Sequence, residues 1–190
     1  METVQQQPPS ARDRILNTAL KLFYQNGVRA TGIDRIIAES GVAKMSFYRN
    51  FPSKADLVAA FLHKRHDNWM GWFTSSVERK IAQPNASLSV IADVLQSWFE
   101  DPGFRGCAFI NTFAEGGPID SEPNHIAREH KQQLKEFVEK IADRLGLNNP
   151  KTVADAAILV IEGAIVRAQM TGNPAEAQTA RLLFQCIEHA

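Results

Sequence analysis

Five residues within the stretch from Ser40 to Leu57 have side chains suited to contacting nucleic acid: Lys44, Met45, Ser46, Tyr48 and Arg49. A lysine ammonium or a tyrosine hydroxyl can bind phosphate oxygens, whereas an arginine can bind a guanine edge through two parallel hydrogen bonds. Serine and methionine can contact base edges or a thymine methyl group. On a helix, Arg49 shares a face with Met45 and Ser46, which precede it by four and three residues. The set predicts a DNA-reading surface, the alternative being a small exposed helix with incidental charges.

Two short helices joined by a tight turn would present this face. The segment IDRIIAES predicts the first helix, with its three isoleucines on one side and Gly41 at its end. The segment AKMSFYRNF predicts the second, which must end near Asn50 because Pro52 disfavours helical angles at the residue before it. This is the helix-turn-helix plan, in which the second helix lies in the major groove of DNA. The apolar residues expected to pack inward are Val42, Phe47 and Phe51.

Residues flanking the two helices complete the expected contact surface. Thr31 can cap the first short helix, and we include it with Gly32 among the residues that contact DNA. Ser53 is expected to begin a long fourth helix through a capping box with Asp56. Lys54 then lies in the first turn, where its charge opposes the helix dipole unless a phosphate is nearby. We therefore expect Lys54 to hold the DNA backbone.

Hydrophobic periodicity predicts helices along nearly the whole chain, and no strand-like alternation occurs. A first helix is expected to follow Ser10 and to end at Gly27, and the fourth helix is expected to reach about residue 80. Further helices are expected over residues 86–100, after Gly106 (a short one), over residues 123–145, from Pro150 onward, and at the end of the chain with Pro174 near the first turn. The expected fold class is all-α, with about nine helices. The expected domains are a loose tail at 1–9, a three-helix DNA-binding domain at 10–52, and a ligand-binding and dimerisation domain at 53–190.

Charge is distributed unevenly along a chain that is neutral overall. Residues 1–65 contain ten lysines and arginines against five acids, and residues 66–190 contain eleven against sixteen. A basic part joined to an acidic part indicates a polyanion-binding module, unless the charges are scattered by chance. No apolar run approaches the ~18 residues of a membrane span, and the N-terminal segment lacks the pattern of a signal peptide. We expect a cytoplasmic protein without a membrane partner.

The segment RILNTALKLFYQNGVRATGIDRIIAESGVAKMSFYRNFPSKADLVAAFL resembles the DNA-binding domain of TetR-family transcriptional repressors. The resemblance rests on the first-helix pattern ending in Phe23 and Gly27, on IIAESGV and on YRNFPSK. It departs at Ala43, where the family usually has Ser or Thr, so the recognition helix lacks its usual cap at a cost of about 1 kcal/mol. Met45 often corresponds to glycine in the family, so base readout there is expected to differ.

This resemblance implies an all-helical homodimer whose two recognition helices bind successive major grooves of a near-palindromic operator in double-stranded DNA. It further implies that the C-terminal two-thirds of the chain bind a small molecule, which changes the spacing of the heads and releases the DNA. The expected function is a ligand-responsive regulator, most often a repressor, without enzymatic activity or cofactor.

Aromatic side chains gather in the middle of the chain, as suits a pocket for a small apolar or planar effector. Cys107 would begin a short helix, where the helix dipole and Arg105 favour the thiolate and its reaction with electrophiles or oxidants. The Gly-Cys segment resembles that of family members that sense such compounds. The alternatives are plain core for the aromatic residues and a small buried hydrophobe for Cys107. The expected ligand-binding residues are Trp69, Phe73, Trp98, Phe99, Cys107, Asn111 and Phe113, and Glu115 is expected on the same surface.

The segment AILVIEGAIVRAQM is apolar over a face so broad that it needs burial on two sides. With the last helix it is expected to form an intermolecular four-helix bundle, as the resemblance implies, the alternative being packing within one subunit. Cys186 is expected to pack on this last helix. The expected interface residues are Ile158, Ile161, Ile165, Leu183, Phe184 and Ile187.

Other classes of protein find less support in the sequence. His63 and His66 could bind a metal, but no cysteine or carboxylate completes a ligand set, so we expect none. An enzyme would use Cys107 or a histidine, yet no Ser/His/Asp or Cys/His arrangement supports this. A non-specific DNA-binding protein would bind in a salt-dependent manner without preferring a palindrome.

Overall fold

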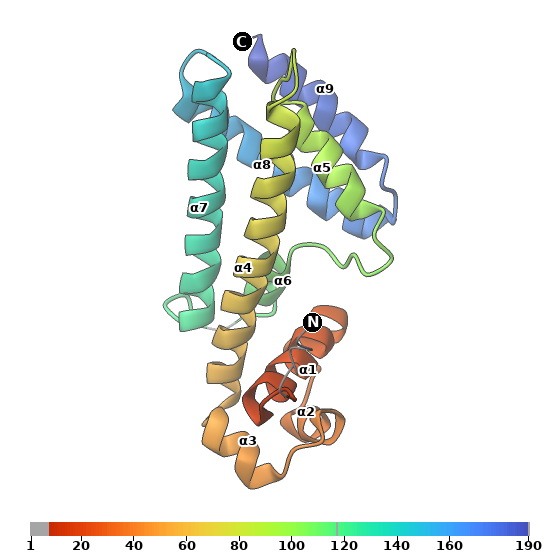
Figure 1. Ribbon diagram of the computed structural model, residues 1–190, viewed down its shortest axis with the longest axis vertical. Coiled ribbons are helices and arrows are strands. Elements are labelled where there is room, and N and C mark those ends of the chain that lie inside the picture. The colour runs from red at the N-terminus through yellow and green to blue at the C-terminus, as the bar shows by residue number, and fades with distance from the viewer. Residues whose placement is uncertain (1–7, 117, 190) are drawn as a thin grey trace, which may run out of the picture.

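The computed structural model describes residues 8–116 and 118–189, and these contain nine helices and no strand. The expected all-α class is therefore confirmed, whereas residues 1–7 of the predicted tail lie outside the described residues. Three short helices form a head at one end, and the remaining helices form a body joined to it by α4 (Figure 1). The helices are α1 (Ala11–Asn26), α2 (Ile33–Ser40), α3 (Lys44–Asn50), α4 (Lys54–Ile81), α5 (Val90–Phe99), α6 (Ala108–Ala114), α7 (Glu122–Arg144), α8 (Pro150–Thr171) and α9 (Glu176–Glu188).

The head is held together by a small apolar core under a well-capped first helix. Ser10 accepts a hydrogen bond from the amide of Asp13 at 3.1 Å, and the Asp13 carboxylate accepts one from the amide of Ser10 at 3.2 Å. This reciprocal pair satisfies two amides that a helix N-terminus leaves without partners. Helix α1 packs on α2, α3 and α4. The fully buried side chains that fill the space between them include Ile15, Leu22, Ile36, Phe47 and Phe51.

Helix α4 connects the head to the body over 28 residues. Ser53 and Asp56 form the capping box predicted from the sequence, with the Asp56 amide donating to Ser53 Oγ at 3.1 Å. Near its start, Phe61 packs edge-on against Phe23 of α1, with ring centroids 5.4 Å apart. Farther along, Phe73 is buried against Phe137 of α7. One rigid helix thus belongs to both parts, so a shift of its body end is transmitted to the head.

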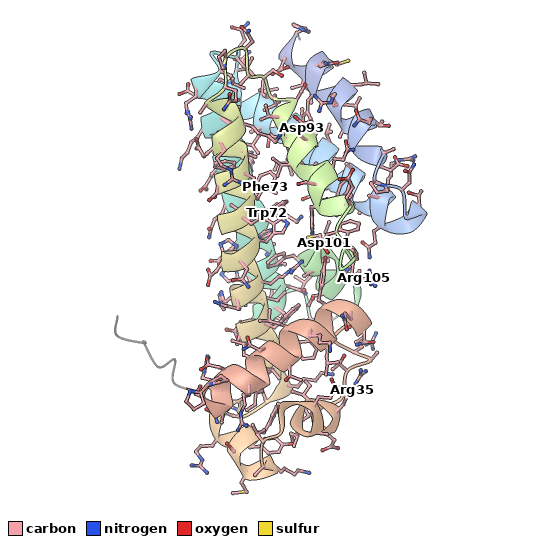
Figure 2. The ribbon with its side chains drawn as sticks, turned by 45° about the vertical axis from the view of Figure 1, so that its right-hand side comes forward. Arg35, Trp72, Phe73, Asp93, Asp101 and Arg105 are labelled. Atoms are coloured by element: carbon pink, nitrogen blue, oxygen red, sulfur yellow. The ribbon has the colours of Figure 1, made fainter. Side chains whose placement is uncertain are left out.

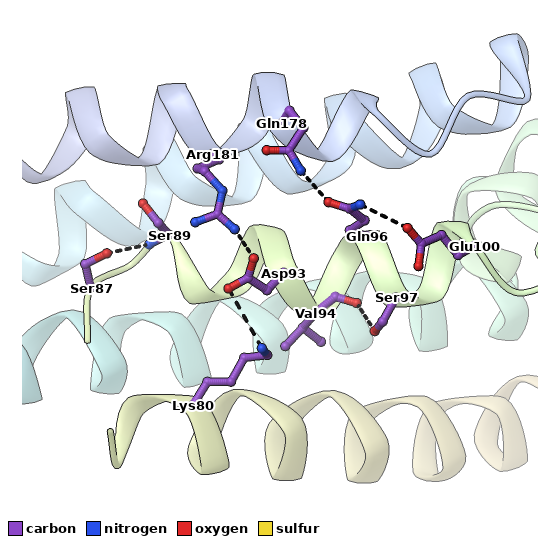
Figure 3. Close-up of polar contacts among 10 residues, drawn as sticks. All are labelled: Lys80, Ser87, Ser89, Asp93, Val94, Gln96, Ser97, Glu100, Gln178 and Arg181. Atoms are coloured by element: carbon purple, nitrogen blue, oxygen red, sulfur yellow. Dashed lines mark hydrogen bonds and ion pairs between the residues drawn. The ribbon is translucent and has the colours of Figure 1, made fainter. Parts of the chain in front are cut away.

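The body is a bundle in which α8 packs between α7 and α9, and α5 packs on α9 and α4. Polar contacts fasten α9 to α5: Arg181 and Asp93 form an ion pair, and Gln178 binds Gln96 (Figure 3). Lys80 of α4 adds a second cation 3.8 Å from Asp93. Helix α5 starts at Val90, later than the expected residue 86. The preceding segment instead forms turns closed by i→i+3 hydrogen bonds, and Asn85 within it has a positive φ. Within residues 8–116 and 118–189, no helix is long and apolar enough to cross a membrane.

Candidate nucleic-acid interface and effector site

Helix α3 has the two faces that the sequence predicts. Phe47 is fully buried and stacks edge-on with Tyr48, whereas Met45 is 78% exposed. Lys44, Tyr48 and Arg49 are also exposed, and Ser46 is half-buried. The helix begins at Ala43 without a side-chain cap, as expected from the missing Ser or Thr. The inward position of Phe47 therefore turns the other five side chains toward the outside of the head.

Thr31 does not belong to this outer surface, contrary to the sequence-based expectation. Its side chain is fully buried, and its hydroxyl donates to the main-chain oxygen of Gly27 at 2.7 Å. The N-cap of α2 is Gly32, and no side chain caps that helix. Thr31 therefore ties the turn after α1, while Gly32 is exposed at the start of α2 and presents only its main chain.

Lys54 lies where the sequence places it, in the first turn of α4 and half-buried. The adjacent Ser53–Asp56 box fixes the start of the helix, so Lys54 stands on a rigid platform close to the end of α3. Lys44 approaches Asp34 of α2 at 3.9 Å, but both side chains are largely exposed. A pair of this kind contributes little to stability, so it leaves the Lys44 ammonium available to an anion.

Glu115, at the end of α6, fastens the body to the head through main-chain groups. Its carboxylate accepts hydrogen bonds from the amides of Val28, at 2.8 Å, and Arg29. The Arg29 guanidinium returns a bond to the Glu115 main-chain oxygen at 3.0 Å. Gly27 precedes these amides at φ 85°, and a Cβ there would lie 2.8 Å from the carboxylate. No local pattern in the sequence reveals this link, because its partners are 86 and 87 residues apart.

A second link joins the same two parts through Tyr24 of α1. Its hydroxyl donates to the main-chain oxygen of Gly106 and accepts from the amide of Arg105, both at 3.0 Å. Figure 2 shows Arg105 on the body side of the head, next to α1. The Arg65 guanidinium lies over the Tyr24 ring, 3.9 Å from its centroid. The segment entering α6 is thereby held against the head at its beginning, as Glu115 holds it at its end.

Cys107 is the N-cap residue of α6 and is only 5% exposed. The cation beside it is Lys131 of α7, whose Nζ lies 3.5 Å from the sulfur. The expected neighbour Arg105 instead donates to the main-chain oxygens of Pro102 and Phe104, at 3.2 and 2.6 Å. Because its guanidinium binds those main-chain oxygens, Arg105 is not the cation beside the Cys107 sulfur, and that prediction was wrong.

Three of the expected ligand-binding residues, Trp69, Trp98 and Cys107, line one small space of about 10 Å³, here called the inner cavity. Arg65, His130 and Lys131 are among its other walls. Phe73 does not line it but stacks flat on Trp69 at 4.7 Å. Phe99 packs instead against Phe104 and Trp98 in the core.

The two remaining expected residues, Asn111 and Phe113, lie elsewhere. Asn111 donates to the main-chain oxygen of Arg105 at 2.9 Å and accepts from Gln169, so it braces the junction with the head. Phe113 lines an open groove of about 660 Å³ between α6, α7 and α8. We call this the outer groove, and its apolar lining is Phe109, Ile110, Phe113, Ala114, Ala127, Ile158 and Leu159. Asn111 and Glu115 line one further open pocket beside Tyr24 and Gly27, as expected, whereas Cys107 lines the inner cavity instead.

His130 is the most strongly perturbed titratable group of this region. It is 2% exposed, stacks on Phe109 with centroids 3.7 Å apart, and has its Nδ1 3.0 Å from Nδ1 of His66. Burial lowers the pKa of His130 to about 2, and the charges of Lys131, His66 and Arg65 act in the same direction. The ring is therefore neutral near pH 7. Within the described residues no cluster of three or more metal-binding side chains occurs.

This neutral histidine gives a prediction about stability and pH. Below about pH 6.5 the unfolded chain binds a proton at residue 130 that the folded protein does not, so stability is full above that pH and falls as the pH is lowered. The loss in the free energy of unfolding approaches at most about 1.4 kcal/mol per pH unit. Chemical unfolding at pH 7.5 and 5.5 is expected to show a smaller loss for His130→Phe than for the parent. His125→Phe, at an exposed position of the same helix, should lose as much as the parent, and equal losses in all three proteins would contradict the assignment.

The expected dimer residues divide between the inside and the outside of the subunit. Ile161, Ile165 and Phe184 are fully buried among neighbouring helices, so they form no interface, which corrects the sequence-based choice. Leu183 is exposed, and Ile158 and Ile187 are half-buried. Cys186 is exposed rather than packed.

An exposed apolar face remains on α8 and α9. Leu159 is 73% exposed, Met170 81% and Leu182 62%. On α8 this face follows the spacing i, i+4, i+7, i+11, which is visible in the sequence. The sequence-based choice of interface residues included the buried isoleucines of this helix instead. The exposed-face residues are Leu159, Gly163, Val166 and Met170 on α8 with Leu182, Leu183 and Cys186 on α9, Val166 being half-buried.

Comparison with known proteins agrees with this architecture. A profile of the family described as "Bacterial regulatory proteins, tetR family" matches residues 15–61, which cover most of the head and the start of α4. SCO4454, a TetR-family transcriptional regulator from Streptomyces coelicolor, superposes with a TM-score of 0.83 over 94% of both chains at 26% identity.

Two curated relatives extend the similarity through the body. The transcriptional regulator YjdC of Escherichia coli is 24% identical over 93% of this chain and 92% of its own length. The transcriptional repressor KstR2 of Mycolicibacterium smegmatis is 23% identical over 70% of this chain and 64% of its own length. These relatives are regulators rather than enzymes. The head thus matches the tetR family of bacterial regulatory proteins, and the chain as a whole has the fold of a TetR-family transcriptional regulator.

Proposed function

We propose that the protein is a ligand-responsive repressor that binds a near-palindromic operator as a homodimer and is released by a small molecule. The observation that carries the proposal is the sidedness of α3, where Phe47 is buried and Met45, Tyr48 and Arg49 face outward. The excess of basic residues in 1–65 supports a polyanionic partner. The name of the repressor KstR2 supports repression rather than activation.

In this proposal the α3 side chains have different roles in DNA recognition. Arg49, Met45 and Ser46 contact base edges, while Lys44 and Tyr48 bind phosphates. Lys54 and the main chain of Gly32 hold the DNA backbone on either side. Residues 10–52 are then the DNA-binding domain, residues 53–190 bind ligand and partner subunit, and the site of action is the cytoplasm.

The exposed face of α8 and α9 is the proposed dimer interface. Three strongly exposed apolar side chains on two neighbouring helices, Leu159, Met170 and Leu182, are unusual on a monomer surface. Gly163 lies between the first two on α8 and permits close approach of a partner helix. A twofold axis through this face would pair α8 and α9 with their copies in a four-helix bundle.

The proposed effector site is the inner cavity together with the outer groove, and α6 couples it to the head. Cys107 at the start of α6 lines the cavity, while Glu115 at its end binds the amides of Val28 and Arg29. A molecule that displaces α6 therefore pulls on the head. Modification of Cys107 by an electrophile is a second route to the same displacement, supported by the Lys131 ammonium beside the sulfur.

Selection of bound duplexes from a random pool tests the proposal. The expected outcome is a twofold-symmetric site whose half-sites lie one helical turn or a multiple apart, because two heads related by an axis read two grooves. Footprinting at increasing salt then separates specific from general binding. Salt-dependent protection without a preferred palindrome would instead assign the protein to the non-specific DNA-binding class.

A further inference from the structure

The inner cavity and the outer groove are separated by only two shared walls, Phe109 and Lys131. The Phe109 ring is held by stacking on His130, and Lys131 Nζ lies 3.3 Å from the carboxylate of Glu162. The cavity, at about 10 Å³, has room for roughly one water. The groove, at about 660 Å³, is in the size range of small-molecule sites. Movement of the two shared side chains would join them into one space.

One residue that lines the inner cavity has a buried hydrogen-bond donor without a partner among the residues that the structure describes. Trp69 lines the cavity and is 8% exposed, and its indole Nε1 has no hydrogen-bond partner within the described part of the chain. A buried donor left unpaired costs about 1–3 kcal/mol. An acceptor oxygen that reaches the cavity recovers this free energy, whereas a purely hydrocarbon ligand does not.

The charges around the cavity favour an anionic acceptor. Its lining includes two cations, Arg65 and Lys131, and no carboxylate among the described residues. His130 adds no repulsion or attraction of its own, because burial keeps it neutral near pH 7. Glu162, the present partner of Lys131, lines the outer groove, so an incoming anion competes with a group near the surface.

The outer groove supplies the complementary apolar surface. Phe113 of α6 is an exposed hydrophobic side chain of its lining, and Ile110 on the same helix is half-buried there. A hydrocarbon or aromatic body placed there removes apolar surface from water on both partners, at about 25 cal/mol per Å². The two spaces therefore have different preferences, one for a charged oxygen and one for an apolar body.

We infer that the effector is a small organic acid with an apolar body, its anionic oxygen bound by Trp69 Nε1 and Lys131 Nζ and its body in the outer groove. This inference rests on the proposed function, since it names the class of molecule that acts at the proposed effector site. Two contributions to the binding free energy can be separated. Any acceptor oxygen can bind the indole N–H of Trp69, but only an anion also pairs with the ammonium of Lys131.

A matched acid and alcohol test the charge preference. In calorimetric titrations of the full chain, 4-phenylbutyrate is expected to bind at least about ten-fold more tightly than 4-phenylbutan-1-ol, as for an added charge-assisted hydrogen bond. Lys131→Met should reduce the acid to the affinity of the alcohol. Lys135→Met is the matched control, because Lys135 lines the same groove but pairs with Asp155, and it should keep the difference.

Indole NMR signals test the position of the acid. The chain has three tryptophans, and Trp69→Phe identifies the signal of Trp69. Addition of the acid is expected to move this Nε1–H signal downfield, as a new acceptor does. Equal affinities of acid and alcohol, the same loss in both lysine variants, or an unmoved Trp69 signal, in proteins whose circular dichroism matches the parent, would each overturn the inference.

The same two probes in an operator-release assay distinguish this inference from the proposed function. If the acid binds with all the expected signatures but the operator stays bound, the chemistry of the site stands and the effector-release part of the proposed function fails. If the alcohol releases the operator and the acid does not, the proposed function stands and the inference is overturned.

Discussion

Leu182→Glu is expected to turn the protein into a monomer and to weaken operator binding by at least about 100-fold. Leu182 projects from the exposed apolar face of α9, where it is 62% exposed in the single subunit. A twofold interface would bring two copies of the new carboxylate into one apolar seam. An unpaired buried charge costs several kcal/mol, so we expect the two subunits to separate. Separated heads then bind half-sites one at a time and lose the gain in effective concentration.

The measurements are light scattering for the oligomeric state and fluorescence anisotropy for operator affinity. Gln185→Glu adds the same charge on an exposed residue of α9, toward the polar side where Gln178 meets Gln96. This control is expected to remain dimeric and to bind as the parent does. A parent that is monomeric would contradict the proposed dimer, and a Leu182→Glu variant that stays dimeric would place the interface elsewhere.

Arg49→Ala is expected to cost about 1–3 kcal/mol of binding free energy per head and to relax the preference for one base pair in each half-site. Arg49 is exposed near the end of α3, on the face opposite the buried Phe47, so truncation leaves the head core intact. In the proposed complex, its loss removes a bidentate contact that would distinguish guanine from the other bases. Affinities for a panel of single-base operator variants measure both effects.

Lys54→Ala separates phosphate contacts from base contacts in the same assay. It is expected to weaken all operator variants alike and to lower the salt dependence by about one charge per head. Arg144→Ala is the control, because Arg144 pairs with Glu78 in the body and its loss also removes one positive charge. If Arg49→Ala and Lys54→Ala both bind the operator like the parent, the recognition surface is not on α3.

The structure of the head was readable from the sequence because local rules determine it. Pro52 stops α3, the Ser53–Asp56 box starts α4, and Phe47 can be buried only if its neighbours face outward. Thr31 was misjudged because its hydroxyl binds the main-chain oxygen of Gly27. Side-chain type predicts neither that partner nor the direction of the turn.

The effector region was less predictable because several aromatic residues on adjacent helices look alike in a sequence. Trp69 lines the cavity and Phe73, one turn later, stacks behind it. Cys107 and Phe113 lie on one short helix but face different spaces, because α6 crosses between the body and the head. That crossing depends on Tyr24 and Glu115, whose partners are about 80 to 90 residues away.

Three of the six predicted dimer residues, Ile161, Ile165 and Phe184, are buried within the subunit for a related reason. Helix α8 is apolar almost all round, so hydrophobicity alone does not tell which side faces its own subunit. Ile161 and Ile165 turn toward the core, while Leu159 and Met170 turn outward. Only the positions of α7 and α9 decide between the two sides.

The Glu115 link also bears on how such a regulator acquires new targets. Because the carboxylate binds the amides of Val28 and Arg29, most of its hold depends on the path of the backbone and little on which side chains occur there. Gly27 maintains that path in a conformation that other residues rarely adopt. We therefore expect that heads with different base preferences can be transplanted onto this body while Tyr24, Gly27 and Glu115 are kept, and that the chimaeras share the proposed effector response.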